Sequence, residues 1–473
     1  MDTTLRIGYV IGSGPNGLTA AILLAQAGIK TIMLEANSTV GGGARSLPLT
    51  LPGFTHDVCS AVHPLAVTSP AFTSFPLAEH GLEWIQPPLA LAHVLDDGLA
   101  VTIEPSLEAT ASRLGRDGPT YRRIVGPLVR QWPQLAKEIL GPIRLPAKPL
   151  LLAHFGALAL WPAETVARAW FRTDPMRALF AGLAAHSAMP LDAMASAAFG
   201  WVLAISAHAV GWPIPRGGSQ QITNALASYF ESLGGRIVVN TKVRSLNELK
   251  DSGITLCDVT PRQFLEIAAD RLPDSFCRKL SRYRYGAGAF KMDWALTDPI
   301  PWNASECARA GTVHIGGTLE EVAASERAAS SGSASSSPFL LLVQPSLFDA
   351  TRAPTGKHTA WAYCHVPNAS TENMTERIES QIERFAPGFK ARILARSVLT
   401  PAALEQHNAN LVGGDFNGGA LSLKQLAVRP TRSLYRTPLH GLYLCSSSTP
   451  PGPGVHGMCG YHAANLALRD VKR

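Results

Sequence analysis

The sequence predicts an α/β fold in which a Rossmann-like domain, assembled from three separate segments, carries an inserted α+β domain. Three observations predict it: a strand, helix and strand at the start, a helix and strand in mid-chain, and a strand and helix near the end. Two blocks of different character separate these pieces. At 473 residues the chain also exceeds one ordinary domain, which holds about 100 to 200 residues.

The first segment begins with an apolar run at residues 5–11, which is typical of a buried parallel strand. Residues 15–27 have the apolar spacing of a helix, and Gly28 ends it. A second strand at residues 29–34 stops at Glu35. This is the order with which Rossmann-like domains begin.

The second and third segments repeat the alternation of helix and strand. In PRGGSQQITNALASYFESLGGRIVVNTKV, the glycine pair Gly217 and Gly218 precedes a helix, and residues 237–239 form a strand. Near the end, the strand GLYLCSS leads through STPPGPGVHG into a helix over about residues 458–468. We therefore assign residues 1–62, 211–280 and 422–473 to the nucleotide-binding domain.

The two intervening blocks, residues 63–210 and 281–421, are assigned to a substrate domain. The first is expected to be helical and apolar. His186, Pro190, Asp192 and His208 interrupt its most apolar stretch, which favours buried helices around a cavity over a membrane span.

The second block is expected to be rich in strands. FKMDWAL alternates, with Phe290 and Met292 on one face and Lys291 and Asp293 on the other. Residues 323–338 have the low-complexity Ser, Ala and Gly composition of a surface loop. The block is therefore expected to supply a mixed sheet to the substrate domain.

The composition limits the classes of partner. Hydrophobic residues make up 46% of the chain and charged residues 16%, and the net charge is only +7, without a polybasic run. No nucleic-acid motif is present.

The seven cysteines lack a CxxC pair, which indicates reduced thiols in a cytoplasm-like compartment. Residues 148–161 are either a core helix or a peripheral contact with a membrane.

Gly12, Gly14 and Gly17 form a GxGxxG motif between the first strand and the first helix. Gly12 permits the tight turn, Gly14 lets the backbone approach a pyrophosphate, and Gly17 allows the helix to pack closely. The helix N-terminus then faces the phosphates. Glu35 is placed to accept hydrogen bonds from a ribose diol.

Two further glycine-rich turns favour FAD over a nicotinamide cofactor. GGGAR, residues 41–45, would place Arg45 near the diphosphate or the flavin edge of an extended dinucleotide. The C-terminal loop PPGPGVHGMCG leads into a helix whose N-terminus would stabilise negative charge on the reduced flavin ring. His456 in this loop either lies beside the flavin or is a capping or surface histidine.

The chain resembles the superfamily of phytoene desaturases, carotenoid isomerases and retinol saturases, and within it the branch of pyridine nucleotide-disulfide oxidoreductase domain-containing protein 2. VIGSGPNGLTAAILLAQAG, PIPRGGSQQITNALASYFESLGG and GLYLCSSSTPPGPGVHGMCGYHAANLAL carry the resemblance. It implies a Rossmann-like FAD-binding domain with an inserted α+β substrate domain. It also implies FAD contacts at Gly12, Gly14, Pro15, Asn16, Gly17, Glu35, Ala36, Gly42, Gly43, Ala44, Arg45, Val243, Gly454, Val455, His456 and Gly457. The chain departs from the branch's name, because disulfide chemistry needs a redox cysteine pair.

Candidate catalytic residues are few, since hydride transfer to flavin depends more on proximity than on side chains. His56 and Asp57 either act as acid and base beside the flavin or orient the hairpin that carries them. His456 is the third candidate. Lys291 and Asp293 share a strand face and either pair with each other or take part in catalysis.

The expected function is hydride exchange between FAD and a carbon–carbon bond of a long apolar molecule, such as an isoprenoid, carotenoid or polyene lipid. Desaturation, saturation and isomerisation all fit. Only one dinucleotide fingerprint is present, so the electron acceptor is oxygen, a quinone or a transiently bound nicotinamide. Two alternatives remain: an amine oxidase or monooxygenase on the same fold, and a non-catalytic binding protein stabilised by FAD. No metal site is expected. The location is expected to be cytoplasmic, with or without peripheral attachment to a membrane.

Overall fold

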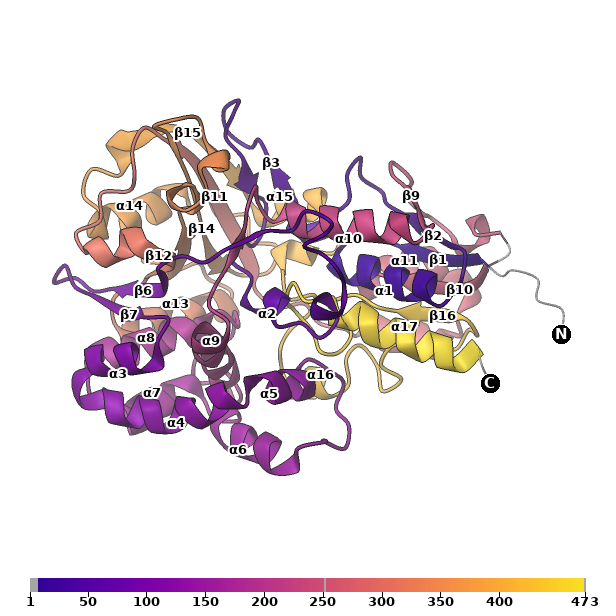
Figure 1. Ribbon diagram of the computed structural model, residues 1–473, viewed down its shortest axis with the longest axis horizontal. Coiled ribbons are helices and arrows are strands. Elements are labelled where there is room, and N and C mark those ends of the chain that lie inside the picture. The colour runs from indigo at the N-terminus through magenta and orange to yellow at the C-terminus, as the bar shows by residue number, and fades with distance from the viewer. Residues whose placement is uncertain (1–6, 251, 472–473) are drawn as a thin grey trace.

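The computed structural model describes residues 7–250 and 252–471. Among these residues, five strands form a parallel sheet at one end of the molecule (Figure 1). The strand order is β16 (Leu442–Leu444), β10 (Ser252–Cys257), β1 (Ile7–Ile11), β2 (Thr31–Leu34) and β9 (Arg236–Val238). All four pairings are parallel. The sheet therefore draws on all three segments that the sequence assigns to the nucleotide-binding domain.

Helices cover both faces of this sheet. On one face α1 (Pro15–Gln26) packs against α10 (Gln220–Ser232) and α17 (Met458–Val471) (Figure 1). The close approach of α17 to α1 requires Gly460, because a side chain there would overlap the carbonyl oxygen of Asn16. On the other face, α11 (Pro261–Ala268) buries Phe264 against a second apolar cluster.

The predicted elements of this domain are present, with shifted boundaries. The first strand begins within the predicted run, whose residues 5 and 6 lie outside the described residues. The second strand starts at Thr31 instead of residue 29, and α17 continues to Val471 instead of ending near residue 468. The strand β10, which lies between β16 and β1, was not predicted.

In the same described residues, seven strands form a second, mixed sheet. The order is β15 (Ile393–Leu399), β11 (Gly288–Leu296), β14 (His358–Val366), β13 (Leu340–Val343), β12 (Ala310–Ile315), β6 (Leu89–Val94) and β7 (Ala100–Ile103). The first block was expected to be helical, and β6 and β7 correct that expectation. The run LALA at the start of β6 is apolar without a break, and such a run has no periodicity that separates a buried strand from a helix.

Apart from the short strand β5 (Trp84–Ile85), the rest of the first block is mainly helical, as expected, and its larger helices pack beside the second sheet (Figure 1). It consists of α3 (Leu107–Arg113), α4 (Gly118–Arg130), α5 (Trp132–Ile139), α6 (Pro149–Ala159), α7 (Ala163–Trp170), α8 (Asp174–Ala185) and α9 (Ala197–Ala209). Its core is aromatic: the rings of Phe180 and Trp201 lie 4.6 Å apart between centroids.

The predicted surface loop at residues 323–338 is wrong for its first half, which lies in α13 (Leu319–Ser331). Thr318 and Glu321 form a capping box at the start of this helix, and Val322 and Ala323 are buried. Alanine and serine there belong to a partly buried helix instead of a loop.

Among the residues that the structure describes, no helix alone combines the length and apolar character needed to cross a bilayer. Only α6 and α7 taken together reach that length and composition, and a bend of 88° separates them.

Candidate functional site

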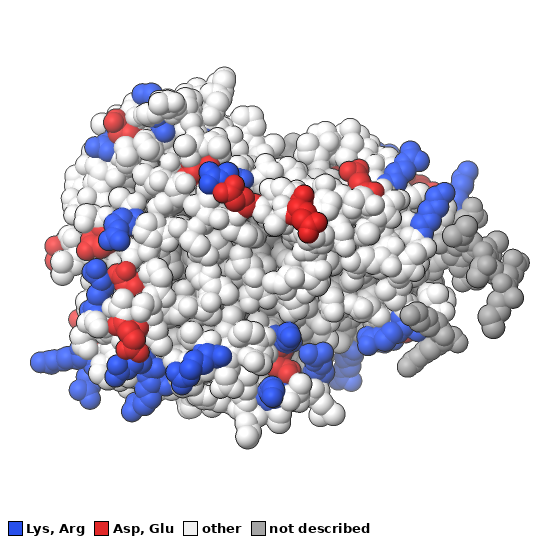
Figure 2. Space-filling model, in the orientation of Figure 1, with Lys and Arg blue, Asp and Glu red and all other residues white. Residues whose placement is uncertain are grey.

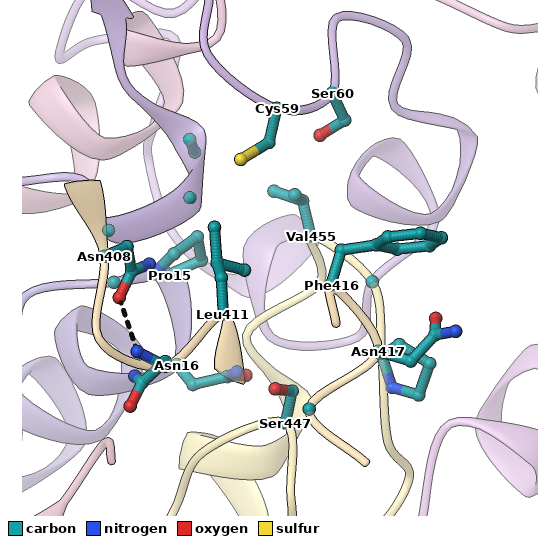
Figure 3. A pocket seen from close by; sticks show the side chains of 18 of the residues that line it. Pro15, Asn16, Cys59, Ser60, Asn408, Leu411, Phe416, Asn417, Ser447 and Val455 are labelled. Atoms are coloured by element: carbon teal, nitrogen blue, oxygen red, sulfur yellow. Dashed lines mark hydrogen bonds between the residues drawn. The ribbon is translucent and has the colours of Figure 1, made fainter. Parts of the chain in front are cut away.

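A large cavity of about 940 Å³ lies where the two sheets meet. Its wall includes strand ends of the first sheet, strands of the second sheet and the helices α5, α6 and α9. Figure 3 looks into it, with Cys59 and Ser60 on one side and Phe416, Asn417 and Ser447 on another. Every predicted cofactor-binding residue lines this cavity except Gly17 and Gly457.

One end of the cavity is polar and is built by loops at the carboxyl ends of parallel strands. These are the loops after β1, after β2 and after β9, where Val243 lies. Glu35 is held firmly: its Oε2 accepts from the Ser13 amide at 2.9 Å, and its Oε1 accepts from the Asn37 amide at 2.8 Å. The carboxylate is thereby oriented at the position that binds a ribose in dinucleotide-binding folds.

The glycine turn after β1 fits a dinucleotide diphosphate. A side chain at Gly14 would begin 2.8 Å from Asp258 Oδ2, so only glycine leaves the backbone accessible. In the described part of the chain, no side chain caps α1 at Gly14, and the buried Oδ1 of Asn16 has no partner. Among the described residues the amides of Gly14 and Asn16 have no acceptor and are left for a phosphate, since Pro15 has no N–H and Leu18 donates to the Gly14 carbonyl. Gly17 lies beneath the turn, where its amide donates to Asp258 Oδ2 at 2.9 Å.

Asp258 is a residue of the site that the sequence analysis missed. It follows β10, lines the cavity and is almost completely buried. Burial raises its pKa to about 7, the Gly17 amide opposes that rise, and the charge of Glu35 adds to it. The signal was present, because Asp258 follows the apolar run ITLC just as Glu35 follows β2.

Two buried cations lie along the middle of the cavity. Arg45 follows the glycine turn η1 (Gly42–Ala44), and its guanidinium donates to the carbonyl oxygens of Gly42 and His407, both at 3.0 Å. Lys291 on β11 pairs with Asp293, as one of the two predicted interpretations held, and its Nζ lies 5.4 Å from the centroid of Trp361. Both cations line the cavity.

The C-terminal glycine loop brings Gly454, Val455 and His456 to the cavity wall. His456 Nδ1 accepts from the Met458 amide at 3.0 Å, so this histidine caps α17 and carries its proton on Nε2. Burial lowers its pKa to about 4. Within the described residues, that buried Nε2 has no partner, so a bound cofactor could accept from it. Gly457 instead packs against Thr19 and Phe72.

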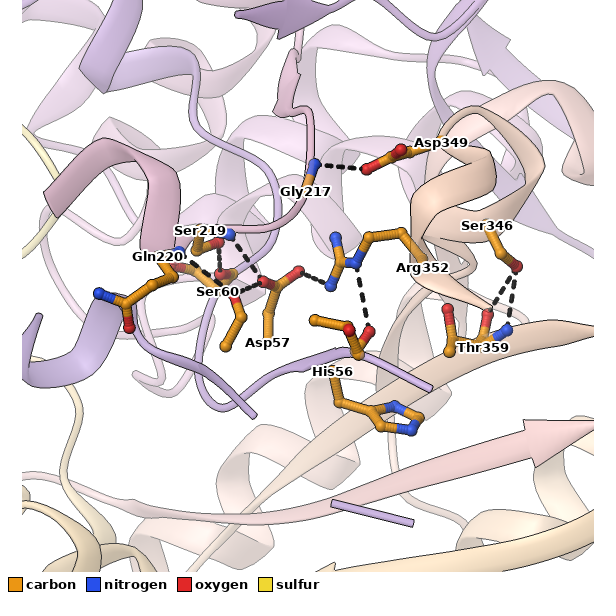
Figure 4. A network of polar contacts seen from close by, with 12 residues as sticks. His56, Asp57, Ser60, Gly217, Ser219, Gln220, Ser346, Asp349, Arg352 and Thr359 are labelled. Carbon is orange, nitrogen blue, oxygen red and sulfur yellow. Dashed lines mark hydrogen bonds and ion pairs between the residues drawn. The ribbon is translucent and has the colours of Figure 1, made fainter. Parts of the chain in front are cut away.

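His56 and Asp57 do not line the cavity. Figure 4 shows Asp57 in a network of polar contacts, with His56 beside it. Asp57 pairs with Arg352 at 2.8 Å and also accepts from the Ser219 amide at 2.7 Å, and all three residues are buried. Burial raises the pKa of Asp57, but Arg352, Ser46 and Ser219 outweigh burial and leave it lowered. The hairpin of β3 (Ser46–Leu47) and β4 (His56–Asp57) is thus held by buried contacts to Ser219 on one side and Arg352 on the other.

His56 is held in the same region. Its Nε2 shares a hydrogen bond of 2.7 Å with Thr50, and its Nδ1 lies 3.6 Å from Asp293 Oδ1. Burial first, and then the charge of Lys291, lower its pKa to about 3, so it is neutral near pH 7. These contacts favour the second of the two interpretations, in which both residues orient the hairpin.

The far end of the cavity is apolar. Its wall is formed there by Ile139, Leu140, Phe155, Ala198, Phe199, Val202 and Leu203. Three aromatic residues also line the cavity: Trp361 and Tyr363 stack with centroids 5.7 Å apart, and Phe416 meets Tyr363 edge-on at 5.7 Å. We call the polar end, built by the glycine turns with Glu35 and Arg45, the cradle, and the apolar end the chamber. The two form one continuous cavity.

Comparisons with known proteins agree with this geometry. Residues 10–75 match the family described as NAD(P)-binding Rossmann-like domain, and residues 104–272 match the family described as flavin containing amine oxidoreductase. Pyridine nucleotide-disulfide oxidoreductase domain-containing protein 2 of Rattus norvegicus is 27% identical over 98% of this chain and 93% of its own length.

Two further proteins are similar along nearly the whole chain. A lycopene-forming phytoene desaturase of Pseudescherichia vulneris is 24% identical over 97% of this chain and 98% of its own length. The crystal structure of an oxidoreductase from Methanosarcina mazei superposes with a TM-score of 0.68 at 14% identity and covers 98% of this chain and 100% of that one.

Proposed function

Because the chain belongs to the superfamily of FAD-dependent oxidoreductases, we propose that it desaturates, saturates or isomerises a carbon–carbon bond of a long apolar molecule such as an isoprenoid or polyene. FAD supplies the hydride acceptor or donor for such a reaction. The single observation that carries the proposal is the continuity of the apolar chamber with the glycine-rich cradle.

The residues of the cradle fit the cofactor. The free amides at the start of α1 would receive the diphosphate, Glu35 the ribose, and the unpartnered donor at His456 Nε2 an acceptor atom of the cofactor. Arg45 is fixed by two backbone carbonyls, so its charge is already oriented before a ligand binds.

The chamber would orient the substrate and exclude water. Its aliphatic and aromatic side chains would bind a hydrocarbon through the hydrophobic effect and hold it near the cradle. Such positioning promotes hydride transfer without an acidic or basic side chain. Arg45 lines the same cavity, and its charge would repel the ammonium form of an amine, whereas the charge of Lys291 is paired with Asp293. This supports an uncharged apolar substrate over an amine.

Extraction of the purified protein into organic solvent, followed by mass spectrometry, tests this proposal. The expected result is a co-purified isoprenoid or polyene that is lost when the chamber is filled by a bulky substitution. FAD-loaded protein that contains no lipid and binds none of a panel of isoprenoids would contradict it.

A second candidate function is the oxidation of amines. It is supported by the match of residues 104–272 to the flavin containing amine oxidoreductases and by the aromatic residues Trp361, Tyr363 and Phe416 in the cavity wall. Release of hydrogen peroxide with amines, and not with isoprenoids, would favour this candidate over the first.

We also propose that the protein takes its substrate from a lipid surface in the cytoplasm. Between the cavity-lining residues Leu140 and Phe155, the chain exposes Ile143, Leu145 and Leu150, which are 78%, 96% and 86% exposed. Exposed Arg144 and Lys148 lie in the same segment, residues 143–150. Figure 2 shows basic side chains beside an uncharged projection at the lower edge, where α6 lies in Figure 1.

Flotation with vesicles of mixed neutral and anionic lipids tests this attachment. The protein should float with the vesicles, and Leu145→Ser with Leu150→Ser should abolish flotation without loss of FAD. Flotation that is unchanged by these substitutions would contradict a role for residues 143–150.

A further inference from the structure

Four buried or half-buried histidines among the described residues gather beside the chamber: His93, His186, His314 and His365. His93 on β6 and His314 on β12 are cross-strand partners, and His186 ends α8. Of these four, His186 lines the cavity. The described residues contain no group of three or more histidine, cysteine or acidic side chains arranged to hold a metal ion.

The hydrogen bonds of the cluster limit where its protons lie. His93 Nε2 donates to the Gly317 carbonyl oxygen at 2.8 Å, which leaves His93 Nδ1 unprotonated. The Nε2 atoms of His186 and His314 lie 2.8 Å apart, so one proton lies between them. Burial lowers the pKa of His186 to about 3 and that of His314 well below its usual value, so both rings are neutral near pH 7.

Gly182 decides which of these two rings holds the shared proton. A side chain at Gly182 would begin 2.5 Å from His314 Nδ1 and 2.8 Å from His93 Nδ1, so both nitrogens face the α-carbon of this glycine. Among the described residues neither nitrogen has a partner. A proton on His314 Nδ1 would be a buried donor without an acceptor, which is costlier and rarer than an unused lone pair. His314 therefore carries its proton on Nε2 and donates it to His186 Nε2.

This arrangement leaves the proton of His186 on Nδ1. That atom has no hydrogen-bond partner in the part of the chain that the structure describes, and unlike the buried Nδ1 atoms of His93 and His314 it is not enclosed by protein. Two further polar groups line the cavity nearby: Asn417, whose amide donates to the carbonyl of Ser187 at 3.2 Å, and Thr312, two positions before His314 on β12. The fourth histidine, His365, pairs with the carboxylate of Glu326 at 2.7 Å.

We propose that His186 Nδ1 is a specificity-determining donor that binds an uncharged oxygen, a hydroxyl or a carbonyl, on an otherwise apolar substrate. The oxygen is uncharged because the rings of His186 and His314 are neutral and His365 is paired with Glu326, so the cluster offers a carboxylate no free cation. The inference rests on the proposed function and narrows its substrate class from hydrocarbons to oxygenated isoprenoids.

The test compares two probes that differ in one group: geranylgeraniol, and the same tetraene with its hydroxyl replaced by hydrogen. Binding to the FAD-loaded protein is followed by the change in the flavin absorbance. The wild type should bind the alcohol about tenfold more tightly, as one net hydrogen bond allows. In His186→Phe the two affinities should become equal, with that of the hydrocarbon unchanged. His186→Asn, whose amide nitrogen takes the place of Nδ1, should restore part of the preference.

A second measurement does not depend on any variant folding. Nitrogen NMR of histidine-labelled wild-type protein should show His186 protonated on Nδ1 and His314 on Nε2. Equal binding of both probes by the wild type, or His186 protonated on Nε2, would overturn this inference and leave the proposed function intact. Binding of neither probe by the FAD-loaded protein would overturn the proposed function and this inference with it.

Discussion

The cradle and the chamber of the cavity present opposite kinds of surface to a ligand. The cradle presents backbone amides, the held carboxylate of Glu35 and the fixed guanidinium of Arg45. The chamber presents side chains, nearly all apolar, with His186, Asn417 and Thr312 as polar exceptions. Function in the cradle therefore depends on the absence of side chains at the glycines, whereas function in the chamber depends on side-chain volume. Substitutions in the two regions should fail in different ways.

The largest effect is expected outside the cavity wall, at the buried pair of Asp57 and Arg352. Asp57→Asn leaves the Arg352 charge buried without its counterion, which should lower the free energy of unfolding by about 3 to 5 kcal/mol. Denaturant unfolding measures it. The double variant with Arg352→Met removes both charges and should recover most of that loss. An Asp57→Asn protein as stable as the wild type would show that this pair does not hold the domains together.

The next largest effect is expected in the cradle. Gly14→Asp places a second carboxylate against Asp258 and fills the approach of the diphosphate, so FAD affinity should fall on the order of a hundredfold or more. Fluorescence titration of apoprotein with FAD measures it. Gly156→Ala on α6, where an added methyl meets open space, is the matched control and should bind FAD normally. Normal FAD binding by Gly14→Asp would place the cofactor elsewhere.

In the chamber, Val202→Trp should weaken the binding of an isoprenoid without changing the binding of FAD. The added ring fills apolar space, so affinity for a C20 isoprenoid should fall roughly tenfold while FAD affinity stays the same. Equilibrium binding of both ligands checks this. Met194→Trp, at a half-exposed position away from the cavity wall, is the control. Loss of FAD from Val202→Trp would mean that the two regions are not separable.

The smallest effect concerns Asp258. Its pKa is raised to about 7 from about 3.9 in an unfolded chain, so the folded state loses stability as the pH rises through this interval. Asp258→Asn cannot ionise and still accepts from Gly17. Its Tm should exceed the wild-type Tm by roughly 1 to 3 °C near pH 8, with the difference vanishing near pH 4. A constant difference across that range would assign the effect to something other than ionisation.

The same contrast explains what the sequence could predict. Gly12, Gly14, Glu35 and Arg45 fall within 34 consecutive residues, at spacings that the geometry of a diphosphate imposes, so the cradle could be predicted from local pattern. Asp258 was missed because β10 was not recognised, although its position repeats that of Glu35.

The chamber could be anticipated only as an apolar region. Phe155, Val202 and Trp361 come from separate elements, and no spacing in the chain brings them together. The role of His186 depends on Gly182 and on strands β6 and β12, one of which was expected to be a helix. The low-complexity stretch at residues 323–338 was predicted to be a loop because of its composition. Composition does not show that Thr318 and Glu321, which precede it, cap a helix.

The central claim is that a ligand in the chamber reaches a cofactor in the cradle. Anaerobic titration of the FAD-loaded protein with oxygenated and plain C20 isoprenoids, recorded as the flavin absorbance, tests it most directly. We predict that the flavin band changes or bleaches with isoprenoids in the wild type, and that the same change in Val202→Trp needs roughly ten times more isoprenoid. A flavin band that no isoprenoid alters, while amines bleach it, would contradict the account.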